Sequence, residues 1–162
     1  MNAELFSLIM AGIIAFVCTF CIVPLCIRLA YSINFVDVPD GKHKQHVRIT
    51  PYLGGVAVYL GFFIAFVLTS PGHVSYLFFG GITLLLMIGL FDDFKPITPR
   101  QKFIGQCMAT LCFLQAGFYL KEQFFYSFLN IFISAFWIVS LINAFNLIDI
   151  MDGLATVTAL GA

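Results

Sequence analysis

The sequence predicts an all-α membrane protein, a polytopic bundle of about five transmembrane helices with the start of a sixth. Of its 162 residues, 61% are apolar without counting glycine and only 10% are charged, where soluble chains have ~25% charged residues. A soluble domain of this size could not bury 20 Phe and 6 Tyr. The eight basic and eight acidic residues cancel, so the net charge by itself indicates no class of partner. Independently of the charge, we expect no nucleic-acid partner.

The spans follow from the gaps between charges, because a helix needs ~20 mostly apolar residues to cross the bilayer. The first gap is Leu5–Ile27, with Pro24 near its end as an expected kink. A second gap, Ile49–Phe91, is 43 residues long, and the turn-forming residues 69–73 divide it. The predicted spans are residues 5–27, 52–68, 74–91, 103–120 and 124–148, within one transmembrane domain over 1–162.

The distribution of Lys and Arg predicts the orientation, because these residues favour short cytoplasmic loops. Only Lys121 falls on one side of the predicted membrane. The other seven fall on the opposite side: Arg28, Lys42, Lys44, Arg48, Lys95, Arg100 and Lys102. That side is predicted to be cytoplasmic, which leaves the N-terminus outside.

Asp92 and Asp93 end the third predicted span on the cytoplasmic side. A helix C-terminus disfavours negative charge, and the cytoplasmic leaflet usually carries anionic lipid. The pair could simply mark a helix end, although Lys or Arg would do so more favourably. A divalent cation is the compensation we expect.

Asp149 and Asp152 follow the fifth predicted span and are spaced to share one helix face. Asn143 and Asn146 precede them at the same spacing. Hydrogen bonding between helices would account for Asn143, as for Asn130, but not for four carboxylates from two helix ends. Oxygen ligands of this kind suit Mg²⁺ held together with substrate phosphates. The sequence therefore predicts a magnesium site and a phosphorylated substrate at the membrane boundary.

The loop between the first two spans carries the complementary positive charge. These residues either set the topology alone or bind an anionic substrate, and they are Lys42, His43, Lys44, His46 and Arg48. Gly54 and Gly55 follow, where the missing side chains let another helix or a ligand approach the backbone closely.

Three segments, taken in order, resemble the signatures of the polyprenyl-phosphate N-acetylhexosamine-1-phosphate transferases, the bacterial membrane glycosyltransferase family 4. The segments are VDVPDGKHKQHVRITPYLGG, GLFDD and NAFNLIDIMDGLA. His46 and the TPYLGG run are more similar to the undecaprenyl-phosphate N-acetylglucosaminyl 1-phosphate transferase branch than to the phospho-N-acetylmuramoyl-pentapeptide transferase branch. These enzymes begin cell-envelope glycan synthesis.

The resemblance implies transfer of a sugar-1-phosphate, with N-acetylglucosamine favoured as the sugar, from a UDP-N-acetylhexosamine to a polyprenyl phosphate lipid. UMP is released at the cytoplasmic face of the bacterial plasma membrane, with Mg²⁺ or Mn²⁺ as cofactor. Asp92 and Asp93 match the catalytic pair. Asp93, Asp149 and Asp152 are implied as metal ligands. The implied substrate-binding residues are Lys42, Lys44, His46, Arg48, Asn146 and Asp149. A homodimer is left open.

Two departures from the family pattern bear on activity. Ile150 stands where relatives usually have Gly between the two acids, and the chain ends near the family's midpoint. We therefore expect the 162-residue piece to be inactive alone. The alternatives are a transporter or channel subunit that uses membrane-edge carboxylates, or a membrane fragment without catalysis.

Overall fold

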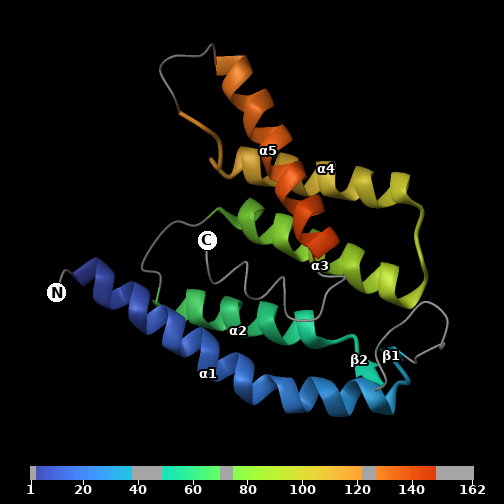
Figure 1. Ribbon diagram of the computed structural model, residues 1–162. Helices are drawn as coiled ribbons and strands as arrows, with labels where there is room; N and C mark the ends of the chain where they lie inside the picture. The colour runs from blue at the N-terminus through green and yellow to red at the C-terminus, as the bar shows by residue number, and fades with distance from the viewer. Residues whose placement is uncertain (1–2, 38–48, 70–74, 122–126, 149–162) are drawn as a thin grey trace. The chain divides into compact units, whose positions relative to one another are not determined.

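The computed structural model describes residues 3–37, 49–69, 75–121 and 127–148 (Figure 1). The elements in chain order are α1 (Ala3–Ser32), β1 (Val36–Asp37), β2 (Thr50–Pro51), α2 (Gly54–Thr69), α3 (Tyr76–Phe94), α4 (Pro99–Gln115) and α5 (Ser127–Ile148). The all-α class is confirmed, and each predicted span overlaps one helix. Two compact units divide the chain, Met1–His73 with Gly89–Pro96 and Val74–Ile88 with Ile97–Ala162.

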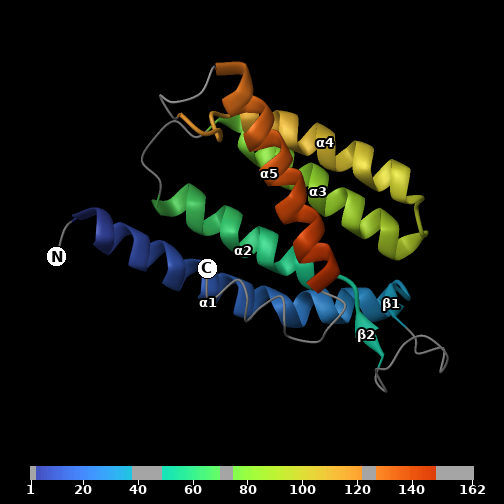
Figure 2. The ribbon, with the colours of Figure 1, turned by 45° about the horizontal axis from the view of Figure 1, so that its top comes forward.

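In the first unit, α1 and α2 lie side by side and antiparallel (Figures 1 and 2). The buried residues of α2 are all small and four apart: Ala57, Gly61 and Ala65. A Cβ atom placed on Gly61 would overlap the Thr19 side chain of α1. Small residues at this spacing let two membrane helices approach closely, and this stripe explains why α2 packs on α1.

The first unit also contains a short β-ladder that the sequence did not predict. Helix α1 continues past Arg28 to Ser32, and Asn34 then reverses the chain at a positive φ of 54°, a conformation that Asn tolerates better than most residues. Strand β1 pairs antiparallel with β2 through Val36 opposite Pro51 and Asp37 opposite Thr50. The ladder holds together the two ends of the loop between α1 and α2.

In the second unit, the first part of α3 lies beside α4 and touches it through side chains, and α5 crosses α4 (Figures 1 and 2). The contacts with α3 are close because α4 and α3 each present a glycine to the other. A Cβ on Gly81 would meet the Phe113 ring, and a Cβ on Gly105 would meet the Ile88 side chain.

Helix α4 begins earlier than the predicted fourth span, at Pro99 rather than Phe103. Thr98 is its N-cap, and a reciprocal capping box joins Thr98 to Gln101. Pro at the first helical position reinforces this start, because its fixed φ suits a helix and its missing N–H needs no partner there. The connection between α3 and α4 is therefore only Lys95–Thr98.

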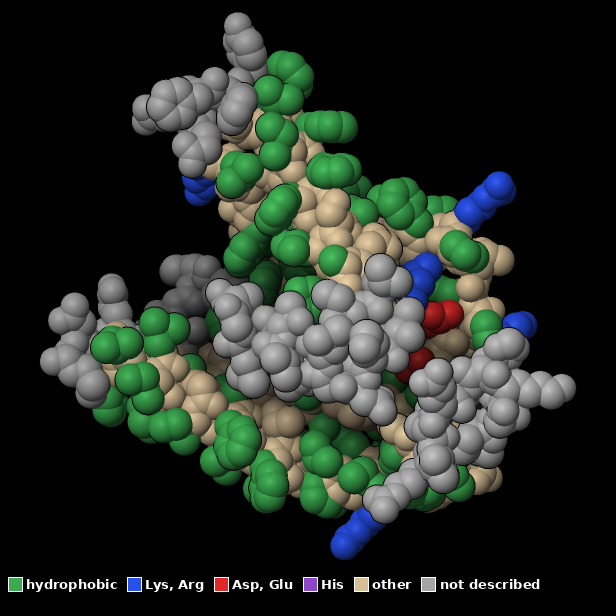
Figure 3. Space-filling view, in the orientation of Figure 1, with side chains coloured by type: hydrophobic (Ala, Val, Ile, Leu, Met, Phe, Trp, Pro, Cys, Tyr) green, Lys and Arg blue, Asp and Glu red, His purple; other side chains and the backbone are tan. Residues whose placement is uncertain are grey.

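Three helices of the described residues are long and apolar enough to cross a membrane, over Leu5–Ser32, Tyr76–Phe94 and Phe128–Asn146. Helix α2 is a shorter apolar helix. Hydrophobic side chains cover the visible surfaces of α1 and α5 (Figure 3), as expected for surfaces that face lipid rather than water. The number of spans, their orientation and the single transmembrane domain stay predictions.

Candidate functional site

Asp92 and Asp93 lie in the last turn of α3, which ends at Phe94. The side chain of Asp92 is half-buried and that of Asp93 is exposed. The backbone N–H of Lys95 donates to the Phe91 carbonyl at 2.8 Å and closes this turn. The predicted position of the acidic pair at a helix C-terminus is confirmed. The negative end of the helix dipole therefore adds to the two carboxylate charges, and the resulting negative potential attracts cations.

The end of α3 packs in the first unit against the residues that flank the basic loop. The Phe35 ring lies 5.1 Å from the Tyr52 ring and 6.2 Å from the Phe94 ring, centroid to centroid. Leu90 packs on a buried cluster formed by Cys26, Ala30, Leu53 and Ala57. The acidic pair therefore shares a compact unit with the two ends of the loop that connects α1 to α2.

Further hydrogen bonds tie these loop ends to α1. The Phe35 N–H donates to the Ala30 carbonyl at 2.8 Å, and the Tyr52 N–H donates to the Phe35 carbonyl at 3.4 Å. The Tyr31 hydroxyl donates to the Ile49 carbonyl, also at 3.4 Å. The predicted substrate-binding residues of the loop itself lie outside the described residues: Lys42, Lys44, His46 and Arg48.

The second predicted motif begins on α5 in the second unit. Asn146 lies near the end of this helix with an exposed side chain, while Asp149 and Asp152 lie outside the described residues. The structure therefore describes three of the nine predicted site residues, Asp92, Asp93 and Asn146, and brings together the first two.

Asn143, one turn before Asn146, makes a hydrogen bond between helices. Its Nδ2 donates to the Gln106 Oε1 of α4 at 3.0 Å and to the Val139 carbonyl of α5 at 2.9 Å. The prediction that Asn143 serves helix–helix hydrogen bonding is confirmed. Gln106, which the sequence analysis missed, is only 2% exposed. The available signal was an amide inside the predicted span 103–120, which contains Gln106 and Gln115, because an amide within a membrane span needs a partner.

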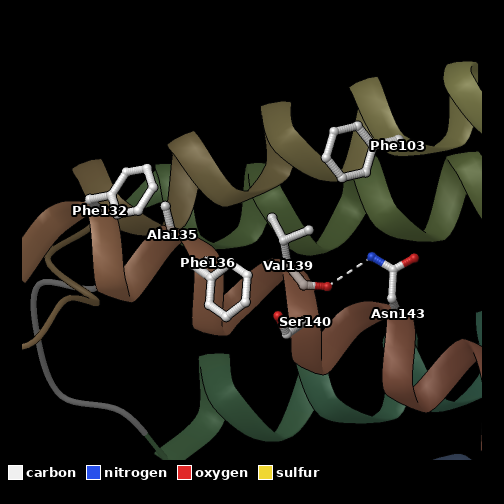
Figure 4. A pocket seen from close by; sticks show the side chains of 7 residues that line it. All are labelled: Phe103, Phe132, Ala135, Phe136, Val139, Ser140 and Asn143. Atoms are coloured by element: carbon white, nitrogen blue, oxygen red, sulfur yellow. Dashed lines mark hydrogen bonds between the residues drawn. The ribbon is translucent and has the colours of Figure 1, made fainter.

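A groove of about 410 Å³ runs along α5 beside α4 and ends at this hydrogen bond. Its lining is apolar except at one end and consists of Phe103, Phe132, Ala135, Phe136, Val139, Ser140 and Asn143. Figure 4 shows the α5 residues in one stripe, with Phe103 contributed from α4. Polarity along the stripe rises toward Asn143, the first residue of the second motif.

No group of three or more His, Cys, Asp or Glu that could hold a metal ion occurs among the residues that the structure describes. The predicted metal ligands were Asp93, Asp149 and Asp152, and only the first belongs to the described part of the chain. Asp93, with Asp92 beside it, offers the hard oxygen donors that Mg²⁺ prefers. The chemistry of this pair fits a divalent cation.

The comparisons with known proteins agree with the resemblance of the three segments. The family model described as glycosyl transferase family 4 matches residues 75–162, which include the acidic pair and the second motif. No solved structure matches the chain.

Three similar curated proteins represent both branches. The probable undecaprenyl-phosphate N-acetylglucosaminyl 1-phosphate transferase of Bacillus subtilis is 28% identical, over 96% of this chain and 46% of its own length. The phospho-N-acetylmuramoyl-pentapeptide-transferase of Streptococcus agalactiae is 31% identical, over 95% and 54%. That of Aliarcobacter butzleri is 36% identical, over 91% and 49%.

The chain spans about half the length of these curated relatives. The matched family region begins just before α3 and extends through α5 to residue 162. With an apolar helical fold, an acidic pair at the end of α3 and a family match over more than half of its residues, the chain belongs to glycosyl transferase family 4.

Proposed function

We propose that this protein acts in the transfer of N-acetylglucosamine-1-phosphate from UDP-N-acetylglucosamine to a polyprenyl phosphate, at the cytoplasmic face of the bacterial plasma membrane. The names of its relatives support the reaction class, since they include an N-acetylglucosaminyl 1-phosphate transferase. The apolar helices support a membrane location. The observation that carries the proposal is the Asp92–Asp93 pair in the last turn of α3.

In this reaction an oxygen of the lipid phosphate forms a bond to the β-phosphorus of the UDP-sugar. The bond from that phosphorus to the bridging oxygen breaks, and its electron pair leaves with UMP. A phosphate nucleophile is already ionised near neutral pH, so a strong base is not required. Catalysis of such transfers depends mainly on positioning and on neutralising charge.

The acidic and the basic site residues have different roles in this reaction. Asp92 and Asp93 orient the reacting groups, and Asp93 with Asp149 and Asp152 would hold Mg²⁺ or Mn²⁺. When bound, the cation supplies positive charge that offsets the phosphate oxygens. Lys42, Lys44, His46 and Arg48 bind the phosphates from the loop, and Asn146 and Asp149 bind the nucleotide sugar. The loop ends and Asp92–Asp93 share one compact unit, which supports this assignment.

The test is transfer of labelled N-acetylglucosamine-1-phosphate by membranes that contain the protein, expressed from its complete reading frame. We expect label in the lipid fraction and an equal amount of UMP. A chelator should abolish both products, and added Mg²⁺ or Mn²⁺ should restore them. UDP-N-acetylmuramoyl-pentapeptide in place of the first donor should give no product. A product only from the pentapeptide donor would contradict the choice of sugar, and no product from either would contradict the reaction.

A further inference from the structure

Gln106 is the largest of the fully buried side chains in the described residues. An amide buried in an apolar surrounding is costly unless it is hydrogen-bonded, and its Oε1 accepts from Asn143 Nδ2 at 3.0 Å. The bond joins α4 to α5 across 37 residues of sequence. We propose that Gln106 is a positioning residue, which holds Asn143 and thereby sets where the next turn of α5 presents Asn146. This inference rests on the proposed function.

The backbone of Gln106 and the residues beside it are well packed in α4. Thr110 Oγ1 donates to the Gln106 carbonyl at 2.8 Å, and Ala109 and Thr110 beside it are buried. The preceding residue, Gly105, lies so close to Ile88 of α3 that a Cβ would overlap that side chain. The segment of α4 that carries the acceptor oxygen of Gln106 therefore packs against α3 as well as bonding to α5.

Asn143 is the residue of α5 through which Gln106 can affect the rest of the second motif. Residues three apart lie on neighbouring turns of the same helix face, so Asn143 and Asn146 move together when α5 rotates. Asp149 follows after a further three residues in the sequence. Because a displacement of about 1 Å at a reacting group can lower a rate about a hundredfold, even a small rotation would matter.

A second polar contact fixes the opposite end of α5. The Leu120 N–H donates to Ser134 Oγ at 2.9 Å, and Ser134 Oγ donates to the Asn130 carbonyl at 2.6 Å. Ser134 precedes Asn143 by nine residues, or about 13 Å of helix. Loss of the Gln106 bond would therefore release the end of α5 that carries the motif and leave the other end in place.

The deciding experiment is nuclear magnetic resonance of the chain in nanodiscs, labelled with ¹⁵N at asparagine side chains and studied without substrate. The sequence holds only five Asn, at positions 2, 34, 130, 143 and 146. In Gln106→Leu we expect the Asn143 and Asn146 amide signals to shift and the Asn34 signal to stay. Gln106→Glu keeps the acceptor oxygen and should restore both positions. Gln115→Leu makes the same change at an exposed site of α4 and should change neither.

An Asn146 signal that stays in place in Gln106→Leu, while the Asn143 signal shifts, would overturn the inference. If Gln106→Leu moves all five signals, the fold has changed. A double variant that swaps the two side-chain amides then decides the question. In Gln106→Asn with Asn143→Gln the amides are swapped and the number of methylene groups is conserved. Its Asn146 signal should lie nearer to that of the unmodified chain than in Gln106→Asn alone. An equal or larger displacement contradicts the role.

Transfer activity of the protein expressed from its complete reading frame gives the second readout. Gln106→Leu should raise the KM for UDP-N-acetylglucosamine, because it displaces Asn146, and should lower kcat/KM about tenfold or more, and Gln106→Glu should recover most of both. Because Gln106 acts through Asn143, Gln106→Leu with Asn143→Leu should be no slower than the slower single variant. If the rate reductions of the two single variants multiply in the double variant, Gln106 does not act through Asn143, and the inference is overturned. An unmodified protein without transfer would contradict the proposed function, while the shifts without substrate would still decide the inference.

Discussion

A single methyl group at Gly61 would collide with α1. The Cβ of Ala would overlap the Thr19 side chain and come within 3.0 Å of backbone atoms of Thr19 and Ala15. Backbone cannot move aside as a side-chain end can, so the two helices must separate. We expect Gly61→Ala to lower stability by about 1–3 kcal/mol, as overpacked cores do, measured by thermal unfolding in detergent.

Gly12→Ala in α1 and Gly54→Ala in α2 are the matched controls, because a Cβ at either position meets nothing within 4 Å. Both should unfold at or above the temperature of the unmodified chain. Equal destabilisation by all three substitutions would show that loss of glycine, rather than the contact with Thr19, is the cause.

The role of a single residue was easiest to predict from the sequence where a charged or amide side chain stands in or at the end of an apolar span. Two adjacent carboxylates at the end of an apolar run marked the end of α3, and Asn143 required a partner inside an apolar helix. Gln106 obeys the same rule and was missed, and nothing in the sequence pairs it with Asn143, which is 37 residues away. The contacts of the Phe35 ring with the Tyr52 and Phe94 rings could not be foreseen among so many aromatic residues.

At the scale of elements, the start of α4 depends on one capping residue. Thr98 Oγ1 accepts from the Gln101 N–H at 3.3 Å, and Gln101 Oε1 accepts from the Thr98 N–H at 3.0 Å. Thr98→Ala removes the first of these acceptors and should cost about 0.5–2 kcal/mol. Amide hydrogen exchange at Gln101 should become faster, while exchange at Thr110 should not change.

Thr98→Ser keeps the hydroxyl oxygen and should retain most of the protection at Gln101. If Ser and Ala variants exchange equally fast, the hydroxyl does not cap α4, and the helix start depends on Pro99 alone.

The existence of the helices was predictable from gaps between charges, but these gaps do not give the helix ends. A charge does not end a helix whose backbone remains hydrogen-bonded, so α1 continues past Arg28 to Ser32. The start of α4 was readable from Thr98, Pro99 and Gln101, which form the usual capping pattern. Strands β1 and β2 contain two residues each, which is too short to show the alternation of apolar and polar residues that predicts a strand.

For the whole molecule, the predicted orientation places the basic loops in the cytoplasm. In a background without the five native cysteines, single cysteines at Gly41 and Lys95 should be shielded from an impermeant thiol reagent in intact cells. One at His73 should react, because seven of the eight basic residues are predicted to lie on the other side. Disrupting the cells should make all three reactive. The opposite pattern in intact cells would place Asp92 and Asp93 outside the cytoplasm.

We expect Asp92 and Asp93 at the end of α3 to serve phosphate transfer rather than only to mark a helix end. Asp92→Asn and Asp93→Asn keep size and hydrogen-bonding capacity while removing one negative charge each. Glu4→Gln and Glu122→Gln are the matched controls, since these acids lie outside the three motif segments.

We would measure the rate of labelled sugar-phosphate transfer to polyprenyl phosphate by these four variants of the protein, expressed from its complete reading frame, at equal amounts of folded membrane protein. We predict that each Asp variant is slower by about a hundredfold or more, a usual cost of removing a charge-positioning group, and that both Glu variants match the unmodified protein. Asp variants that transfer at the unmodified rate would mean that the acidic pair only marks the end of α3.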